Sequence, residues 1–242
     1  MTEELFRNDA TLTTCDATVV AVDDDGIELD RTVFYPQGGG QAGDAGVLRT
    51  ADGREVPIAD ARKRRDAPGR IVHVLAQSAG AAGTAPLQPG ERVTASIDIE
   101  RRRAHMRFHT ATHLLCALVP HPVDGCSITA AYARLDFHMT EPLDKAELNA
   151  GLARLVAEAH PVRLRWISDA ELDANPQLVR SMSVQPPRGA GRVRLVEVDG
   201  VDLQPCGGTH VANTAEIGAV VVTKIEKKSA ATRRVVLGFA QA

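Results

Sequence analysis

Two short segments of this sequence each carry a pair of side chains that bind transition metals. His109 and His113 are four residues apart in HTATH, and Cys206 and His210 are four apart in CGGTH. Residues i and i+4 lie on one face of a helix, so a single turn can present both His109 and His113. Imidazole and thiolate favour zinc over magnesium or calcium, and a tetrahedral zinc ion needs four such donors. We therefore predict a zinc site made of these four residues.

Each half of this motif has a second interpretation. Two histidines four apart on an apolar helix also occur in protein cores, and only the combination with Cys206 and His210 makes a metal site the stronger hypothesis. No Glu follows His109, which excludes the HExxH metalloprotease arrangement. Four protein ligands would close the coordination sphere, whereas catalytic zinc keeps one position open. Either His210 is a loose ligand, or the ion expands to five ligands, or zinc only orders the pocket.

The helix with the histidines also carries two hydroxyl groups, on Thr110 and Thr112. Either side chain can bond back to the helix backbone. Both threonines are candidate catalytic residues. Thr112 directly precedes a ligand, so it is the better candidate to contact a small substrate group beside the metal. His73, His121, His138 and His160 lack a ligand partner at useful spacing, and we expect them to be structural or exposed.

Three successive glycines, Gly38, Gly39 and Gly40, lie in the segment FYPQGGGQAGD. Helix and strand propensities do not explain such a run. It forms either a tight turn or bulge, or a loop whose backbone comes very close to a ligand or to another domain. No GK[ST] follows, so it is not a phosphate loop.

Composition is that of an ordinary globular protein: 242 residues, 44% hydrophobic, 24% charged, with a net charge of −3. The N-terminus has no signal-peptide pattern and no run is long enough for a membrane span, so we expect a cytoplasmic protein with no membrane partner. The four cysteines are expected to be reduced. Basic residues gather at 62–65, at 101–103 and near the C-terminus, where they form either solvated faces or nucleic-acid contacts. Aromatic residues, at 3%, are too few to favour binding by base stacking.

The pattern of the chain predicts an α+β fold in two domains, 1–94 and 95–242. The first is β-rich, with alternating segments such as ATVVAV and IVHVL. Residues 77–91 form an expected loop or linker. A strand at 93–99 then precedes a helix that carries the histidines, and a second helix begins after Asp144, with an apolar face of Leu148, Leu152 and Leu155. Four later strand-like runs, VRLRWI, VRLVEV, AVVVTKIE and RRVVLGF, predict an antiparallel sheet packed on these helices.

FYPQGGGQAGD, HTATHLL and CGGTHVANTAEIG, in this order, closely resemble segments of the free-standing alanyl-tRNA editing proteins of the AlaX family, in the longer form that has a glycine-rich domain. The resemblance extends over nearly the whole chain. It implies an N-terminal β-barrel with the glycine loop, followed by an α/β zinc-containing editing domain that threonyl- and alanyl-tRNA synthetases share. It also implies hydrolysis of tRNA-Ala charged with serine or glycine.

By position, the resemblance implies that the zinc ligands are the four residues already named and that Thr112 helps to recognise the wrong amino acid. Arg233 and Arg234 match a basic pair and are candidates for tRNA binding, as are the three glycines. No segment resembles the class II aminoacylation core, so we expect neither tRNA charging nor use of ATP; the oligomeric state is left open. Two rival hypotheses remain: a noncatalytic, zinc-stabilised tRNA-binding module, and editing of a different aminoacyl-tRNA.

Overall fold

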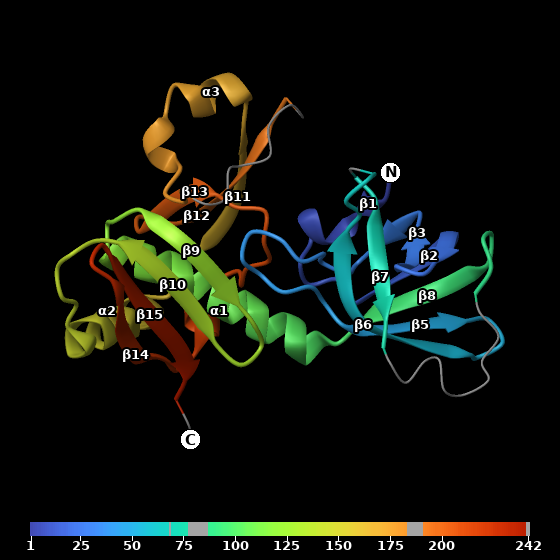
Figure 1. Ribbon diagram of the computed structural model, residues 1–242, viewed down its shortest axis with the longest axis horizontal. Helices are drawn as coiled ribbons and strands as arrows, with labels where there is room; N and C mark the ends of the chain where they lie inside the picture. The colour runs from blue at the N-terminus through green and yellow to red at the C-terminus, as the bar shows by residue number, and fades with distance from the viewer. Residues whose placement is uncertain (68, 77–86, 183–190, 241–242) are drawn as a thin grey trace. The chain divides into compact units, whose positions relative to one another are not determined.

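The computed structural model describes residues 1–67, 69–76, 87–182 and 191–240 (Figure 1). Their contacts divide the chain into two compact units. The first, which we call the barrel unit, comprises Met1–Gly38 and Ala42–Arg103; the second, the metal unit, comprises Gly39–Gln41 and Ala104–Ala242. The division therefore falls inside helix α1, whereas the sequence places a domain boundary near residue 95.

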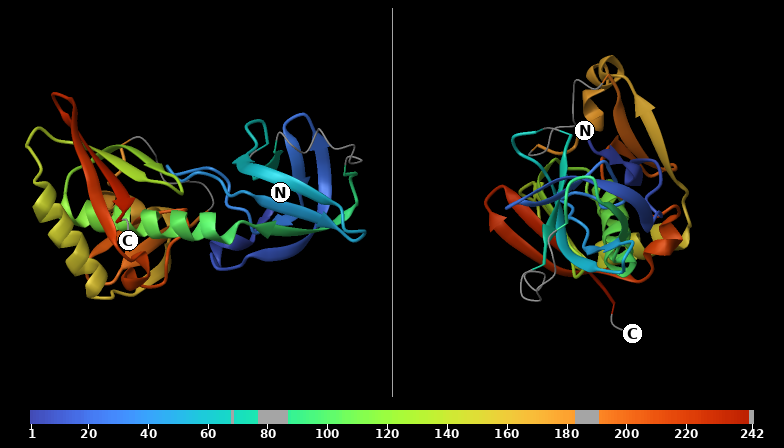
Figure 2. Two further views of the ribbon diagram at one scale, coloured as in Figure 1. Left: turned by 90° about the horizontal axis from the view of Figure 1, so that it is seen from below. Right: turned by 90° about the vertical axis from the view of Figure 1, so that its right-hand side faces the viewer.

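Six strands of the barrel unit close into a barrel in the order β2-β3-β7-β6-β5-β8 (Figure 2). Their bounds are β2 Thr14–Asp23, β3 Gly26–Leu29, β5 Gly46–Thr50, β6 Glu55–Lys63, β7 Ile71–Leu75 and β8 Arg92–Ile97. Alternate residues of β8 are buried. In β6 the alternation of Val56 and Ile58 is broken by a register shift before Ala61, and in the segment IVHVL of β7, predicted to alternate, the first three residues are all buried. Short elements β1 Glu3–Glu4, η1 Leu5–Arg7 and β4 Arg31–Thr32 complete this unit.

The metal unit is built around helix α1, Ile99–Leu118, which confirms the predicted histidine helix. A four-stranded sheet of order β14-β15-β10-β9 packs one face towards the helices and leaves the other face open (Figure 1). In β10, for example, Leu135 and Phe137 are buried, whereas His138 is exposed. The strands of this sheet are β9 Val123–Ile128, β10 Ala133–His138, β14 Val220–Ser229 and β15 Thr232–Phe239.

A second, three-stranded sheet in the metal unit has the order β11-β12-β13, with bounds β11 Val162–Ile167, β12 Val193–Val198 and β13 Asp202–Pro205. The prediction of one sheet is therefore wrong: VRLRWI and VRLVEV pair with each other, while AVVVTKIE and RRVVLGF pair with each other and with β10. Strand pairing is non-local, so alternation within each run does not show which partner it has.

Helix α2, Lys145–Ala157, begins where the sequence predicts. The Asp144 carboxylate accepts hydrogen bonds from the backbone N–H groups of Ala146 and Glu147, which satisfies two donors of the first turn. Leu148, Leu152 and Leu155 form its buried face. The remaining short helices are α3 Asp169–Asp173, η3 Pro176–Leu178 and η4 Thr214–Ile217.

Most of the expected loop at 77–91 lies outside the described residues. Within the described part of the chain, no helix is long and apolar enough to cross a membrane.

Candidate metal centre

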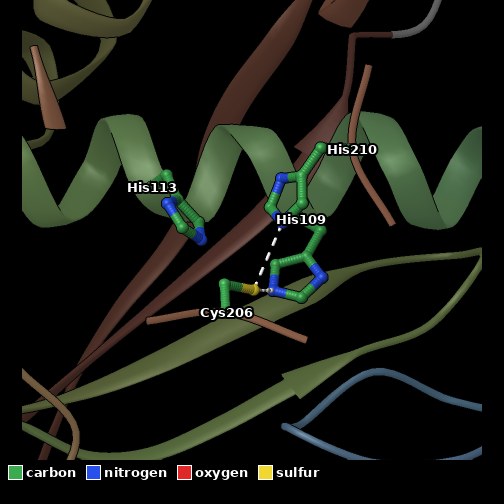
Figure 3. Close-up of side chains that lie close together, drawn as sticks. All are labelled: His109, His113, Cys206 and His210. Carbon is green, nitrogen blue, oxygen red and sulfur yellow. Dashed lines mark hydrogen bonds between the residues drawn. The ribbon is translucent and has the colours of Figure 1, made fainter. Parts of the chain in front are cut away.

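Helix α1 presents two imidazole rings on one face, one turn apart. His109 and His113 are both buried, and their ring centroids are 5.6 Å apart (Figure 3). The residues around them on the helix, among them Phe108, Leu114 and Leu115, are fully buried in the core. A helix fixed on its apolar sides holds its two histidines with little freedom to rotate away from each other.

The segment that follows β13 brings the second pair of ligands to the same place. The Cys206 Sγ atom lies 3.4 Å from His109 Nε2 and 3.2 Å from His210 Nε2 (Figure 3). The four candidate ligand atoms of His109, His113, Cys206 and His210 all lie within 4.8 Å of one another. The sequence prediction that these four residues form one cluster is thus confirmed.

Each histidine of the cluster is oriented through its Nδ1 atom by a buried acceptor. His109 Nδ1 is 2.7 Å from Gln41 Oε1, and His113 Nδ1 is 2.9 Å from an Asp202 carboxylate oxygen. His210 Nδ1 is 3.1 Å from Thr110 Oγ1, whose own hydrogen is donated to the Met106 carbonyl. All three contacts place the ring hydrogen on Nδ1 and leave Nε2 as the ligand atom, which is the usual arrangement around a protein-bound metal.

Electrostatics in the cluster favour the metal-binding forms of Cys206 and His210 but not that of His113. Burial raises the pKa of the Cys206 thiol. The neighbouring His109 and His210 lower this pKa by more than burial raises it, so that it lies well below its ordinary value. Burial and the nearby His109 lower the pKa of His210. A thiolate and neutral imidazoles are the ligand forms that metals require. Burial lowers the pKa of His113, but the Asp202 carboxylate and the Cys206 thiol outweigh burial and raise it to about 9, so an incoming ion must displace a proton from this ring.

The donor set and its spacing fit a tetrahedral ion of the size of zinc. Zinc–sulfur and zinc–nitrogen bonds of about 2.3 and 2.05 Å imply a sulfur–nitrogen edge of about 3.6 Å in a tetrahedron. The two measured Sγ–Nε2 distances, 3.4 and 3.2 Å, are close to that edge. The four residues can therefore hold a metal ion, and the mixture of three nitrogens and one sulfur is typical of zinc.

Gly40 of the glycine segment packs closely against Cys126 within the metal unit. This residue has φ +84°, and a Cβ atom there would lie 2.8 Å from Cys126 Sγ. Its carbonyl accepts a hydrogen bond of 2.7 Å from the Ile128 N–H. The structure shows the turn, and Gly40 in it packs closely against Cys126; an approach of these glycines to a ligand or to the other unit stays a prediction. Without a side chain at 40, the next residue, Gln41, can enter the core beside His109.

Gln41 and Asp202 are site residues that the sequence reasoning missed. Gln41 is fully buried, and besides contacting His109 it accepts from the Thr209 N–H at 3.1 Å and donates to the Thr209 hydroxyl at 2.9 Å. These two bonds fix which end of the amide faces His109. A polar residue directly after three glycines was the available signal for Gln41. Asp202 had no comparable signal, because it contacts a histidine 89 residues away.

The two threonines of HTATH have different positions. The Thr110 hydroxyl bonds Met106 O and His210, so it belongs to the support of the cluster. The Thr112 hydroxyl is buried and donates to His109 O at 2.7 Å. A hydroxyl that donates once still has lone pairs to accept another hydrogen bond.

Several of the basic residues noted in the sequence are occupied inside the barrel unit. Arg102 is completely buried and donates to the Asp44 carboxylate, Ala10 O and Val33 O. Arg64 pairs with Glu28 and Asp25. These two arginines therefore stabilise the fold.

Comparisons with known proteins add an independent line of information. Residues 193–236 match the model of the threonyl and alanyl tRNA synthetase second additional domain. Residues 7–101, which include all six barrel strands, match the model of class II (A) tRNA synthetases. The second match, like the first, relates the chain to tRNA synthetases.

Curated relatives match over nearly the whole chain. The chain is 35% identical to the alanyl-tRNA editing protein AlaX-M of Methanosarcina acetivorans, over 97% of each protein. It is 32% identical to the alanyl-tRNA editing protein AlaX-L of Pyrococcus horikoshii, over 95% of this chain and 56% of the relative. It is also 34% identical to the alanine–tRNA ligase of Metallosphaera sedula, over 93% of this chain and 25% of the ligase.

Proposed function

Because the chain belongs to the AlaX family of alanyl-tRNA editing proteins, we propose that it hydrolyses the ester between tRNA-Ala and a wrongly attached amino acid. Serine is the proposed main substrate, with glycine as the second. The observation that carries the proposal is the buried cluster in which three histidines, each held at Nδ1, turn their Nε2 atoms towards the Cys206 thiol. Such a reaction takes place where aminoacyl-tRNA is used, so we place the protein in the cytoplasm.

Zinc is the proposed cofactor, held by His109, His113, Cys206 and His210. When bound, zinc polarises a carbonyl oxygen and lowers the pKa of bound water, both of which assist ester hydrolysis. Gln41, Thr110 and Asp202 hold the imidazole rings in the orientation that the ion requires. Since Thr110 is fully engaged in this support, we assign it to positioning and not to contact with substrate.

Thr112 is the proposed residue that distinguishes serine from alanine. Its hydroxyl donates to His109 O, which fixes its rotamer and leaves a lone pair to accept a hydrogen bond from the hydroxyl of serine. Alanine has no hydroxyl, so the buried Thr112 oxygen would gain no hydrogen-bond donor from an alanyl group. A site built to bond a hydroxyl can reject the analogue that lacks one.

The open face of the four-stranded sheet is the proposed contact with tRNA phosphates. Asp136, 2% exposed, accepts from Arg134 at 3.1 Å, Lys228 at 2.9 Å and Arg234 at 2.7 Å. Burial alone raises the pKa of this carboxyl, but Arg234 and Lys228 lower it to about 2. Three cations around one carboxylate leave an excess of positive charge that is held in place, and fixed cations bind phosphates without reading sequence.

Arg233 has a different proposed role from its neighbour Arg234. It is 9% exposed and donates to the backbone carbonyls of Ser229 and Thr140. We therefore assign Arg233 to the support of the β14–β15 turn. The glycines Gly38, Gly39 and Gly40 act, in this proposal, by letting Gln41 reach the cluster, and so assist substrate binding indirectly.

Deacylation assays test the proposal directly. Ser-tRNA-Ala and Ala-tRNA-Ala are incubated with the protein as isolated, after chelation, and after zinc is returned. Zinc-dependent loss of serine with alanine spared supports editing. Binding of tRNA without turnover would instead support the noncatalytic module, and hydrolysis of another aminoacyl-tRNA alone would support the second rival.

A matched pair of cysteine variants separates the metal site from general thiol effects. Cys206→Ala removes a proposed ligand and should abolish zinc-dependent hydrolysis. Cys15→Ala removes a partly buried thiol of the barrel unit and should leave hydrolysis unchanged. Equal activity of both variants would contradict the assignment of Cys206.

A further inference from the structure

The single tryptophan of the chain lies in a register row with a proposed metal ligand. Trp166 of β11 is directly opposite Arg194 of β12. Arg194 O in turn accepts the hydrogen bond of the Cys206 N–H, at 3.1 Å, which continues the β12–β13 register by one residue. Residues directly opposite each other in an antiparallel sheet share a face. Trp166, Arg194 and Cys206 therefore lie on the same face, and Trp166 is two strand spacings, about 10 Å, from Cys206.

Trp166 is exposed in a way that a core residue is not. Strand β11 is an edge strand of its sheet, and the Trp166 side chain is 42% exposed. On the opposite face of this sheet, Ile167 packs against a small apolar core that contains Val193 and Leu195. The indole is thus not needed to fill that core, and a large aromatic surface remains open to solvent beside the site.

A cation lies against this aromatic ring. The Arg192 guanidinium carbon is 4.6 Å from the centroid of the Trp166 ring. The pair therefore combines a flat aromatic surface with a positive charge, which together match a nucleobase and its phosphate. Aromatic residues and arginine planes are the usual partners of unpaired RNA bases.

We infer that Trp166, with Arg192 against it, is a stacking platform for the terminal base at the 3′ end of the tRNA. The inference rests on the proposed function, since the ester to be cleaved is on the ribose of that terminal nucleotide. When the ester lies at the metal cluster, the base of the same nucleotide must lie no farther from the cluster than the length of one nucleotide. Trp166, in the same row as Cys206, is at that separation. Although aromatic residues are scarce in the composition, one correctly placed ring is sufficient for one base.

Arg194 connects the platform to the metal cluster. It is buried, and its guanidinium donates to Cys206 O at 2.7 Å and to Gly208 O at 3.0 Å. The Arg194 side chain thus ties β12 to the ligand segment by hydrogen bonds, and Trp166 is joined to Arg194 by the pairing of β11 with β12. The platform and the ligand segment are held at a fixed spacing, so that stacking of the base also positions the ester.

Fluorescence gives a direct binding test, because Trp166 is the only tryptophan. The probe is a short single-stranded RNA that ends in CCA, compared with the same RNA that ends in CC. We expect the CCA strand to quench the tryptophan emission and the CC strand to quench it much less. Equal quenching by both strands, or none, would overturn the inference. A change in emission that depends on protein concentration without RNA would assign the face to a second copy of the chain and would also overturn it.

Variants of Trp166 test the contribution to the reaction. Trp166→Ala should raise KM for Ser-tRNA-Ala by about 5- to 150-fold, the range for loss of one base–aromatic stack, with little change in kcat. Trp166→Phe keeps an aromatic ring and should recover most of the loss. The matched control is Leu164→Ala, because Leu164 lies on the same face of the same strand and is 41% exposed. A control that raises KM as much as Trp166→Ala would contradict a specific platform.

The two hypotheses fail in different ways. If the wild-type protein does not deacylate Ser-tRNA-Ala, the proposed function fails, whatever the RNA-binding result. If it does deacylate but Trp166→Ala has unchanged KM and wild-type emission does not respond to CCA, only the platform fails. Since the side chain is partly exposed, circular dichroism of Trp166→Ala should match the wild type, which confirms that the variant is folded.

Discussion

The barrel unit and the metal unit both bury histidines, but they use the ring nitrogens differently. In the barrel, His73 bonds Thr32 Oγ1 at 2.8 Å through Nε2 and Ile27 O at 2.9 Å through Nδ1. Both nitrogens are satisfied, so nothing is left for a ligand. In the metal unit, an oxygen atom holds Nδ1 of each cluster histidine, and Nε2 of His109 and of His210 contacts the Cys206 thiol, a potential metal ligand. Burial alone therefore does not identify a functional histidine; the partner of each nitrogen does.

The largest expected effect is a loss of stability in the barrel unit when its buried ion pair is broken. Arg102→Met leaves the Asp44 carboxylate buried without its cation, and breaking such a pair costs about 3–5 kcal/mol in the free energy of unfolding. The matched control is Arg103→Met, because Arg103 pairs with Glu100 at an exposed position and its loss should cost less than about 1 kcal/mol. Urea unfolding of both variants checks this. Similar costs would show that Arg102 does not have the structural role assigned to it.

The second expected effect is a pH dependence of the stability of the barrel unit. Burial lowers the pKa of His73 to about 4, although its bond to Ile27 opposes the shift. In the unfolded chain the pKa is about 6.5. As pH falls below about 6.5, the unfolded chain takes up a proton that the folded barrel does not accept until about pH 4. The contribution of neutral His73 to the free energy of unfolding is thus fully present above about pH 6.5. It decreases by up to about 3 kcal/mol as the pH falls towards 4.

Hydrogen exchange of β3 and β7, measured between pH 7 and pH 4 and corrected for intrinsic rates, follows this loss. His73→Gln should be less stable at pH 7 but should show a smaller pH dependence. His138→Gln is the control, since His138 is exposed beside Asp124 and should leave the dependence of β3 and β7 as in the wild type. A wild-type barrel with no loss of protection at pH 4 would contradict the assignment of His73.

The third effect concerns the acceptors that orient the cluster. Asp202→Ala removes the partner of His113 Nδ1 and should weaken zinc binding by about 10- to 100-fold. Asp199→Ala is the matched control, because Asp199 lies in the same hairpin but pairs with Arg163 at the surface. Competition with a chromogenic chelator measures both affinities. If the two variants bind zinc equally, the carboxylate does not support the metal.

The smallest expected effect concerns selectivity. Thr112→Val removes the hydroxyl proposed to accept from serine and should lower the ratio of seryl to alanyl hydrolysis by about tenfold, equivalent to about one hydrogen bond. Thr223→Val, which alters an exposed threonine of β14, is the control. The two ratios are measured with Ser-tRNA-Ala and Ala-tRNA-Ala under the same conditions. An unchanged ratio for Thr112→Val would remove this residue from the proposed recognition of serine.

The sequence predicted those features that depend on near neighbours in the chain. Helix α1 and the Asp144 cap of α2 follow from spacing within one or two turns, and both ligand pairs are separated by only four residues. The division into two sheets was not predictable in this way, because β10 pairs with β15, about one hundred residues later in the chain. Gln41 and Asp202 were missed for the same reason: their histidine partners are 68 and 89 residues away.

The central proposal is that His109, His113, Cys206 and His210 form one zinc centre, whereas His73 is structural. Metal analysis combined with X-ray absorption at the zinc edge tests this claim most directly. The account predicts one zinc per chain with a first shell dominated by one sulfur and three nitrogens, lost in Cys206→Ala and retained in His73→Gln. A protein that binds no zinc, or whose zinc shell contains no sulfur, would contradict it.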